Sequence, residues 1–365
     1  MILNTLPIQP YARAPRGRCL LNGREVAGWI SLEVENNSFH SADTFRALFA
    51  ISLLPPDYDL AWFASQLQFR VQIELDDGNG MVPFILGNAD SIRFDPVART
   101  VELEGRDLTA VLIDDRTTEH YRNLTASQIA TKIAQKHGLT PVVTPTSAKA
   151  GSYYQIDHVQ MQDEQSEWEL LFYLAQREEF VCFVRGIELH FEPMPSPATA
   201  DRYQVDWQEL VTGPVSNVAD LKFERTLTVS KGVVVEVHSF NAKQKKGFQV
   251  SYPKVTKSVG GARAGQAKPK AQVYRYTFPN LTHEQALQKA QALYKQIIQH
   301  EMKLDGTLPG DNLLMPEVMI EMTGTGSQFD QPYYVDSIRR HLDVSSGYTM
   351  SFSAKNHNPN STQAQ

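Results

Sequence analysis

The chain has 365 residues, of which 42% are hydrophobic and 10% aromatic, and its formal net charge is −6. This length predicts two or three domains, the apolar content excludes a disordered chain, and the acidic balance argues against a dedicated nucleic-acid-binding protein. The N-terminus shows no secretory signal pattern, and no apolar run is long enough for a membrane-spanning helix. Cys19 and Cys182 stand in unrelated segments, so we expect free thiols.

The first 113 residues carry the period-two pattern of β-strands. Apolar and polar residues alternate over 69–75, and Asp76–Gly80 supplies residues that tolerate the backbone angles of a tight turn. A second strand pair follows over 91–95 and 100–105, with a turn between them. We therefore expect a β domain over 1–113.

Helical signals begin after residue 113. Thr125 with Gln128, and Ser166 with Glu169, have the spacing of N-terminal capping boxes. The stretch 180–193 then predicts a strand pair that turns near Arg185 and Gly186. Together these signals predict a small α+β unit over 114–215.

The segment 243–275 carries nine Lys or Arg and no Asp or Glu, which leaves a net charge of −15 on the rest of the chain. We interpret it as an arm that contacts an acidic surface of a neighbouring protein. The candidate contact residues are Lys243, Lys245, Lys246, Lys254 and Lys257. A solvated loop and contact with nucleic acid are the alternatives, and only three aromatic residues are present for base stacking.

After this arm the sequence predicts one long helix and more strands. Thr282 with Gln285 begins an amphipathic pattern that predicts a helix over 283–303, with Leu293 and Ile297 buried against the α+β unit. Before the arm, the valine run at 233–235 predicts a strand buried on both faces. Three strand-like runs follow the helix, and the tail at 355–365 is polar.

The sequence shows no catalytic or metal-binding pattern. His283–Glu284 and His300–Glu301 lack the second histidine of a zinc motif, and the glycines of 260–265 have no strand-to-helix context. Glu188 and Glu192 would lie about 13 Å apart on a strand, too far for a glycosidase pair. We therefore expect no enzymatic activity, no catalytic residue, no cofactor and no metal.

Several segments, in this order and spacing, together resemble one family, the hub proteins of contractile phage tails called late control protein D. This family is related to the tube-forming part of VgrG spike proteins. The segments that carry the resemblance are 105–116, 127–139, 166–180 with 186–193, 224–246, 308–342 and 347–355.

The resemblance implies an α+β, mainly β fold with two similar antiparallel β-barrel tube domains and an inserted small α+β domain. The expected division is 1–113 for the first barrel, 114–215 for the insert, 216–243 with 305–354 for the second barrel, 244–304 for the arm and long helix, and 355–365 for a flexible tail. Barrel-wall strands are expected at 69–75, 100–104, 226–237 and 333–340.

The implied function is a homotrimeric baseplate hub that joins a sixfold tail tube to a threefold central spike. Its partners would be the tail tube protein, the spike protein and baseplate wedge proteins, in a virion tail assembled in the host cytoplasm. No membrane contact is expected, nucleic acid would only pass through the lumen, and spike or wall-cutting activity would belong to another polypeptide. The alternative is a peptidoglycan-binding or wall-degrading tail module, because 129–139 is similar to helices of small wall-binding domains.

Overall fold

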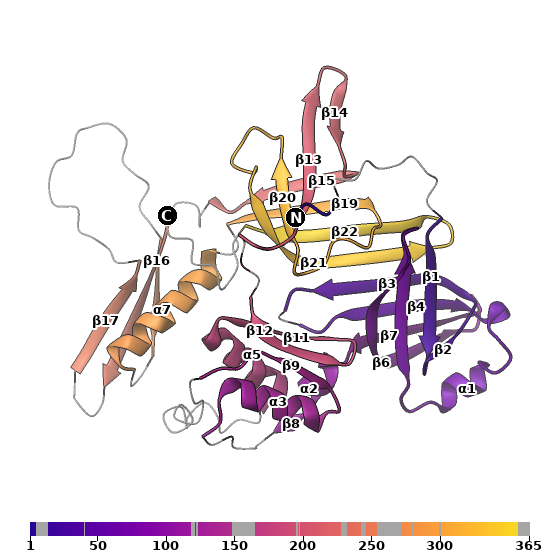
Figure 1. Ribbon diagram of the computed structural model, residues 1–365, viewed down its shortest axis with the longest axis horizontal. Coiled ribbons are helices and arrows are strands. Elements are labelled where there is room, and N and C mark those ends of the chain that lie inside the picture. Colours follow the sequence, from indigo (N-terminus) through magenta and orange to yellow (C-terminus); the bar gives the residue numbers. More distant parts are fainter. Residues whose placement is uncertain are drawn as a thin grey trace.

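The computed structural model describes residues 1–4, 14–39, 41–117, 121, 123–147, 165–194, 196, 198–227, 232–241, 246–253, 272–278, 281–298 and 301–356. A 14-stranded sheet forms the body of the molecule, and three smaller sheets accompany it (Figure 1). The mainly β, α+β class expected from the sequence is confirmed. No helix in the described part of the chain has the length and apolar content needed to cross a membrane.

The first half of the large sheet contains seven strands with the spatial order β3-β4-β7-β6-β5-β1-β2. Their bounds are β1 (Arg16–Leu21), β2 (Arg24–Glu25), β3 (Trp29–Asn37), β4 (Thr44–Ala50), β5 (Arg70–Asp76), β6 (Met81–Asp95) and β7 (Thr100–Asp107), and a 3₁₀ turn (Ile51–Leu53) and helix α1 (Leu60–Ser65) separate β4 from β5. All of these pairings are antiparallel, and the two predicted hairpins are confirmed.

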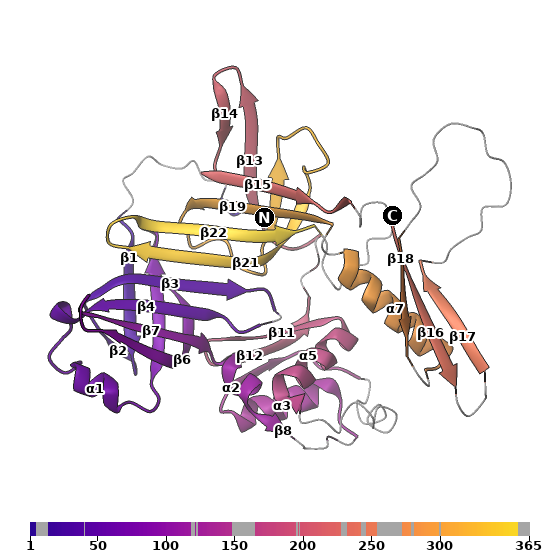
Figure 2. The ribbon, with the colours of Figure 1, turned by 180° about the vertical axis from the view of Figure 1, so that it is seen from behind.

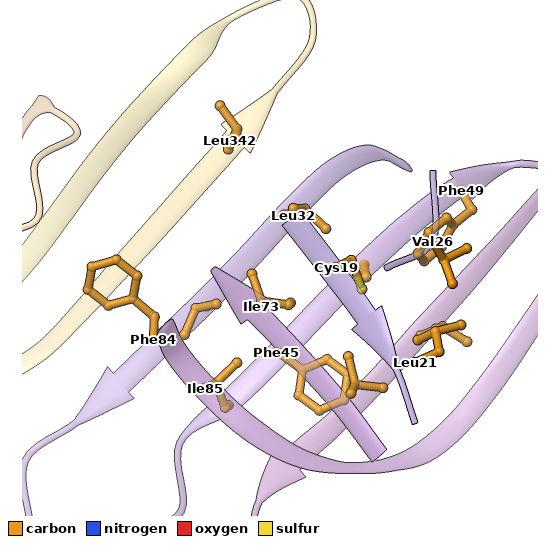
Figure 3. Close-up of a cluster of buried hydrophobic side chains, with 14 of the residues drawn as sticks. Cys19, Leu21, Val26, Leu32, Phe45, Phe49, Ile73, Phe84, Ile85 and Leu342 are labelled. Atoms are coloured by element: carbon orange, nitrogen blue, oxygen red, sulfur yellow. The ribbon is translucent and has the colours of Figure 1, made fainter. Parts of the chain in front are cut away.

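The alternating pattern of these strands builds one apolar core. In Figure 3, Cys19, Leu32, Phe45 and Ile73 point into the same space, and Leu342 reaches it from the second half of the sheet. Each of these side chains is buried, because every second residue of a strand faces the same side.

The second half of the sheet repeats this strand order as β15-β19-β22-β21-β20-β13-β14. Its strands are β13 (Arg202–Leu210), β14 (Gly213–Ser216), β15 (Asp220–Arg225), β19 (Met302–Pro309), β20 (Met319–Thr323), β21 (Pro332–Asp343) and β22 (Gly347–Lys355). One pairing differs, because β13 runs parallel to β20 whereas β1 runs antiparallel to β5. Among the described residues neither half closes into a barrel by backbone pairing, so the two expected barrels are matched only by two open sheets of like topology.

The inserted α+β unit lies against one side of the sheet (Figures 1 and 2). It contains α2 (Thr109–Asp114), β8 (Arg116–Thr117), α3 (Ala126–Lys136), β9 (Thr140–Val143), β10 (Gln165–Ser166), α5 (Glu167–Glu178), β11 (Phe180–Arg185) and β12 (Glu188–Pro193). Both predicted capping boxes and the predicted strand pair are confirmed. Residues 202–215, expected in this unit, instead belong to the large sheet, because β13 pairs with β14 and β20.

A fourth unit contains β16 (Val233–Asn241), β17 (Lys246–Tyr252), β18 (Gln272–Thr277) and α7 (His283–Ile298). The expectation that 226–237 belongs to the wall of the second barrel is wrong for β16, because within the described part of the chain this strand pairs with β17 and β18 and not with the large sheet. Val233, Val235 and Val237 are buried while the residues between them are partly exposed, so this strand has one buried face and not two. Figure 2 shows the unit at one end of the molecule.

The long helix differs from its expected extent and packing. It ends at Ile298, and residues 302–303, expected in the helix, belong to β19, whose alternate residues from Met302 are buried in the apolar core of the second half. Leu293 and Ile297 pack in the same cluster as Val235 and Val237, not against the α+β unit as expected. The polar tail also begins later than expected, since Lys355 is the last residue of β22.

Candidate assembly surface

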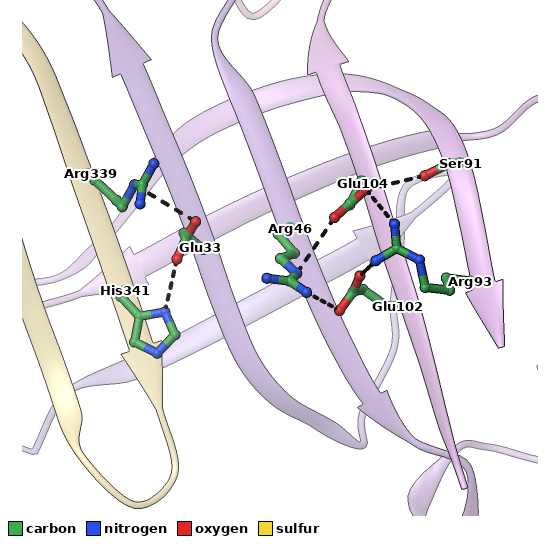
Figure 4. Close-up of polar contacts among 8 residues, drawn as sticks. All are labelled: Glu33, Arg46, Ser91, Arg93, Glu102, Glu104, Arg339 and His341. Carbon is green, nitrogen blue, oxygen red and sulfur yellow. Dashed lines mark hydrogen bonds and ion pairs between the residues drawn. The ribbon is translucent and has the colours of Figure 1, made fainter. Parts of the chain in front are cut away.

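The two halves of the sheet meet where β21 pairs with β3, from Ser337 opposite Asn37 to Asp343 opposite Ser31. Charged side chains cross this joint on its exposed face (Figure 4). Arg339 donates to Glu35 at 2.8 Å, and His341 Nδ1 lies 3.4 Å from Glu33. Directly opposed residues of opposite charge stabilise antiparallel pairing, so the pair of Arg339 and Glu35 favours the observed register.

The charged sheet face extends from this joint across the first half. Arg46 on β4 lies 2.5 Å from Glu102 on β7 and 3.7 Å from Glu104, and Arg93 on β6 also contacts both carboxylates (Figure 4). The hydrogen bond that Arg46 donates to Glu102 raises the pKa of the guanidinium. We call Glu33, Glu35, Arg46, Arg93, Glu102, Glu104, Arg339 and His341 the charged sheet face. Each of these exposed ion pairs contributes little to stability. Together they give this face of the sheet a hydrated surface on which positive and negative side chains alternate.

The opposite side of the same joint holds a fully buried arginine. Arg340 donates to the Asn36 side chain at 2.9 Å and to the carbonyls of Leu314 and Asp311, and its guanidinium lies 4.1 Å from the ring centroid of Phe84. Burial lowers the pKa of Arg340. A buried guanidinium is tolerated only where its N–H groups find acceptors. Because Asn36 belongs to the first half and Leu314 and Asp311 to the second, both halves are needed to bury Arg340.

The connection between β19 and β20 docks on the first half. The backbone N–H of Asn312 donates to the Asp77 carboxylate at 3.2 Å, and the side-chain amide of Asn312 donates to the Leu75 carbonyl at 3.0 Å. The Tyr203 hydroxyl donates to the neighbouring Asp311 at 2.5 Å. This connection therefore fixes the tip of the β5–β6 hairpin against the second half.

One contact of the α+β unit involves both halves of the sheet. Phe183 packs on Phe39 with ring centroids 5.2 Å apart, and Arg185 forms an ion pair with Glu317. Asp43 lies beside this contact, and burial raises its pKa to about 6 even though it accepts hydrogen bonds from Asn36 and Asn37.

Among the described residues, one cluster carries residue types that can bind a metal. The carboxylates of Asp115 and Glu167 and the ring of His137 lie within 4.8 Å of one another. The ammonium of Lys136 already contacts Asp115 at 2.9 Å and Glu167 at 2.8 Å, and His137 Nε2 lies 2.5 Å from Glu167. The charged groups of the cluster are therefore paired with one another, and they connect α3 to α5. Its members are far apart in sequence, so spacing rules did not reveal it.

The predicted contact lysines gain no support from the structure. Lys243, Lys245, Lys254 and Lys257 lie outside the described residues, and Lys246 is the first residue of β17, with its side chain outside the description. The expected role of these residues therefore stays a prediction. The charged sheet face and the buried arginine were not anticipated, because each depends on strands from both ends of the chain.

The architecture is that of tail proteins from phages and of related secretion-system components. No protein-family model and no curated protein matches the sequence. The tail protein from Neisseria meningitidis MC58 is similar, with a TM-score of 0.66, 15% identity, and coverage of 94% of this chain and 96% of the other. The 43 kDa tail protein of prophage MuSo2 from Shewanella oneidensis gives 0.64 and 15%, with coverage of 95% and 99%.

A third similar structure is the E. coli c3393 protein, a component of the type VI secretion system described as similar to the T4 tail proteins gp27 and gp5. Its TM-score is 0.54 at 12% identity, with coverage of 95% of this chain and 79% of the other. These likenesses confirm, at the level of the fold, the resemblance to tail hub and VgrG-related proteins drawn from the sequence.

Proposed function

We propose that this chain is a structural baseplate hub of a contractile phage tail or tail-like particle. In this role it forms a homotrimer that joins a sixfold tail tube to a threefold central spike, with tube, spike and baseplate wedge proteins as its partners. Its place is the virion tail baseplate, assembled in the host cytoplasm. The observation that supports the proposal is the repeated strand order of the two halves, which lie side by side in one sheet.

The physical reason is symmetry. A closed ring requires each interface to repeat, so a sixfold tube cannot match a threefold spike without an adaptor. Three copies of a chain with two similar halves offer six similar surfaces on one side and three distinct sites elsewhere. The polar, mixed-charge sheet face suits the wall of a water-filled passage, through which nucleic acid could pass without being held. We therefore assign the two halves to two tube domains, open in the isolated chain.

We also propose that the hub has no catalytic activity. The metal-capable cluster of Asp115, His137 and Glu167 is paired internally with Lys136, and this pairing leaves it little capacity to activate water. The segment 129–139 that suggested a wall-binding module buries Ile129 and Ile133 in the core of the α+β unit. These two residues are therefore packing residues in the proposed hub.

Light scattering and cryo-electron microscopy of the purified protein test the proposal. We expect a mass three times the 41.1 kDa of one chain and a ring with threefold symmetry and sixfold features on one face. We expect no release of fragments from purified peptidoglycan. A stable monomer or dimer at assembly concentrations, or wall hydrolysis abolished by one carboxylate substitution, would contradict it.

A further inference from the structure

The large sheet ends in two strand edges that have no backbone partner among the described residues. Strand β6 pairs with β5 only as far as Asn88, and beyond that point its partner is β7 alone. Strand β15 pairs only with β19. An open edge exposes unpaired backbone donors and acceptors and is a template for another strand.

The internal joint shows how such edges fit together. By strand order, β6 corresponds to β21 and β15 corresponds to β3, so the open edges are the counterparts of the two strands that form the joint. The correspondence extends to a bulge, because the register of β6 against β7 shifts between Ala89 and Ser91, and that of β21 against β22 shifts between Val335 and Ser337. Residues 91–95 therefore correspond to 337–341.

The same rows of the sheet identify the counterpart residues on β15. The row from Ser91 passes through Glu104 and Arg46 to Glu33. The equivalent row from Ser337 passes through Ser353 and Asp305 to Lys222. Lys222 thus takes the place of Glu33, and Glu224 takes the place of Glu35.

We propose that the β6 edge of one copy pairs antiparallel with the β15 edge of a second copy, in the register of the internal joint. Transfer of that register places Ile92 opposite Arg225, Arg93 opposite Glu224, Phe94 opposite Phe223 and Asp95 opposite Lys222. The inference rests on the proposed hub function for the number of copies in the ring. It adds to that function the surface and the register through which the copies join.

The charges at these positions are complementary. In the internal joint, Arg339 donates to Glu35 at 2.8 Å. Arg93 opposite Glu224 has the same arrangement, with the arginine on the strand that corresponds to β21 and the glutamate on the strand that corresponds to β3. Asp95 opposite Lys222 places a second pair of opposite charges where His341 faces Glu33. A slip by one residue would move each of these side chains to the other face of the sheet and lose both pairs.

The apolar side of the β6 edge is also incomplete in a single copy. Ile92 is 36% exposed and Phe94 37% exposed, although they lie opposite the buried Leu103 and Val101 of β7. They line a cavity of about 430 Å³ together with Leu60 and Phe63 of the α1 segment. Phe223 of an adjoining β15 strand would cover this surface and remove it from water.

The contact is head-to-tail, because one edge of each copy meets the other edge of the next. Such an interface forms a ring when its rotation closes and a filament when it does not. Since the internal joint relates two halves of one chain, repetition of the same geometry between chains continues one sheet around the assembly.

Disulfide trapping tests the register. Directly opposed residues of an antiparallel pair have Cα atoms about 4.5–5.5 Å apart, within disulfide range. We expect the variant with both Arg93→Cys and Glu224→Cys to form covalent dimers and trimers on mild oxidation, while each single variant does not. The native Cys19 and Cys182 are buried, and burial raises the pKa of both thiols, so we expect neither to form a cross-link.

The matched register control carries Arg93→Cys and Lys222→Cys. These diagonal positions lie about 7–8 Å apart in the proposed pairing, and we expect at least fivefold less cross-linking. Equal or stronger cross-linking of the control overturns the register. A native oligomer whose Arg93→Cys/Glu224→Cys variant stays uncross-linked overturns the inference but leaves the hub function standing, whereas a chain that stays monomeric overturns both.

A second variant tests the apolar side without a new thiol. Phe94→Asp is expected to weaken self-association at least tenfold in sedimentation, while Val97→Asp, in the exposed turn that follows β6, changes it less than twofold. Equal association of the two variants overturns the proposal. A β6 edge occupied by a different tail protein in a purified particle does so as well. If Phe94→Asp does not fold, the proposal is tested by the cross-linking of the two cysteine-pair variants alone.

Discussion

Arg340 on β21 donates a hydrogen bond of 2.9 Å to the side chain of Asn36 on β3, although the two residues are 304 positions apart in the chain. This contact lies on the buried side of the joint between the two halves of the sheet, beneath the exposed pair of Arg339 and Glu35. The joint is therefore held on one face by a buried cation and on the other by hydrated ion pairs.

Replacement of Arg340 by Ala is expected to lower the free energy of unfolding by about 3 kcal/mol or more. The substitution leaves the Leu314 and Asp311 carbonyls and the Asn36 side chain without their donor in a dry site, and it opens a cavity beside Phe84. Urea unfolding measures the loss. The adjacent Arg339→Ala, which removes an exposed pair, should cost less than about 1 kcal/mol, and equal costs would contradict the assignment.

The buried Asp43 predicts a pH dependence of stability. Its pKa is raised by burial to about 6, so the folded state holds this proton more tightly than the unfolded state does. The resulting contribution is therefore present at low pH and is lost as pH rises from about 4 to about 6.

We expect the stability difference between the native chain and Asp43→Asn to fall by about 1 kcal/mol or more over this pH window. Chemical unfolding at pH 4, 5, 6 and 7 measures that difference. A matched Asp57→Asn variant, at an exposed carboxylate, should show a constant difference. A constant difference for Asp43→Asn would contradict the prediction.

Helix α7 packs on its small sheet through fully buried alanines, among them Ala290. Ala290→Asp places an unpaired charge against Val235 and Val237, and we expect a loss of about 3 kcal/mol or more. Hydrogen exchange should show increased exchange across β16 and α7. The same substitution at the exposed Ala292 of this helix should cost less than about 1 kcal/mol. Ile297→Asp should cost less than Ala290→Asp, because Ile297 is only partly buried.

The ion-pair cluster between α3 and α5 predicts a variant that gains metal binding. Lys136→Ala removes the ammonium that contacts Asp115 and Glu167 and leaves two carboxylates and His137 around one space. We expect the variant to be destabilised by about 3 kcal/mol, because Glu167 is fully buried. Added Zn²⁺ should restore part of its melting temperature but leave that of the native chain unchanged. The variant Lys136→Ala/Glu167→Gln should lose this rescue.

The sequence was informative where structure is local. Capping boxes at Thr125 and Ser166 identified the starts of two helices, and the alternation over 69–75 identified β5. These signals depend on hydrogen bonds and side-chain direction within a few residues, so no distant partner was needed to read them. The end of α7 was misjudged because no Gly or Pro stands between Ile298 and Asp305 to mark it, and the pairing of β19 with β22 cannot be read from the sequence.

The sequence by itself determined the mainly β class and most elements, because apolar periodicity and cap residues act over short range. The order and spacing of several segments also carry the resemblance to tail hub proteins. Only the tertiary structure decided which strands share a sheet, where β16 belongs, and that Arg340, Asn36 and Phe84 meet. It also revealed the repeated strand order of two halves whose letters show no likeness. Sheet pairing is set by contacts between residues far apart in the chain, and many side chains satisfy the same buried position, so topology repeats where sequence does not.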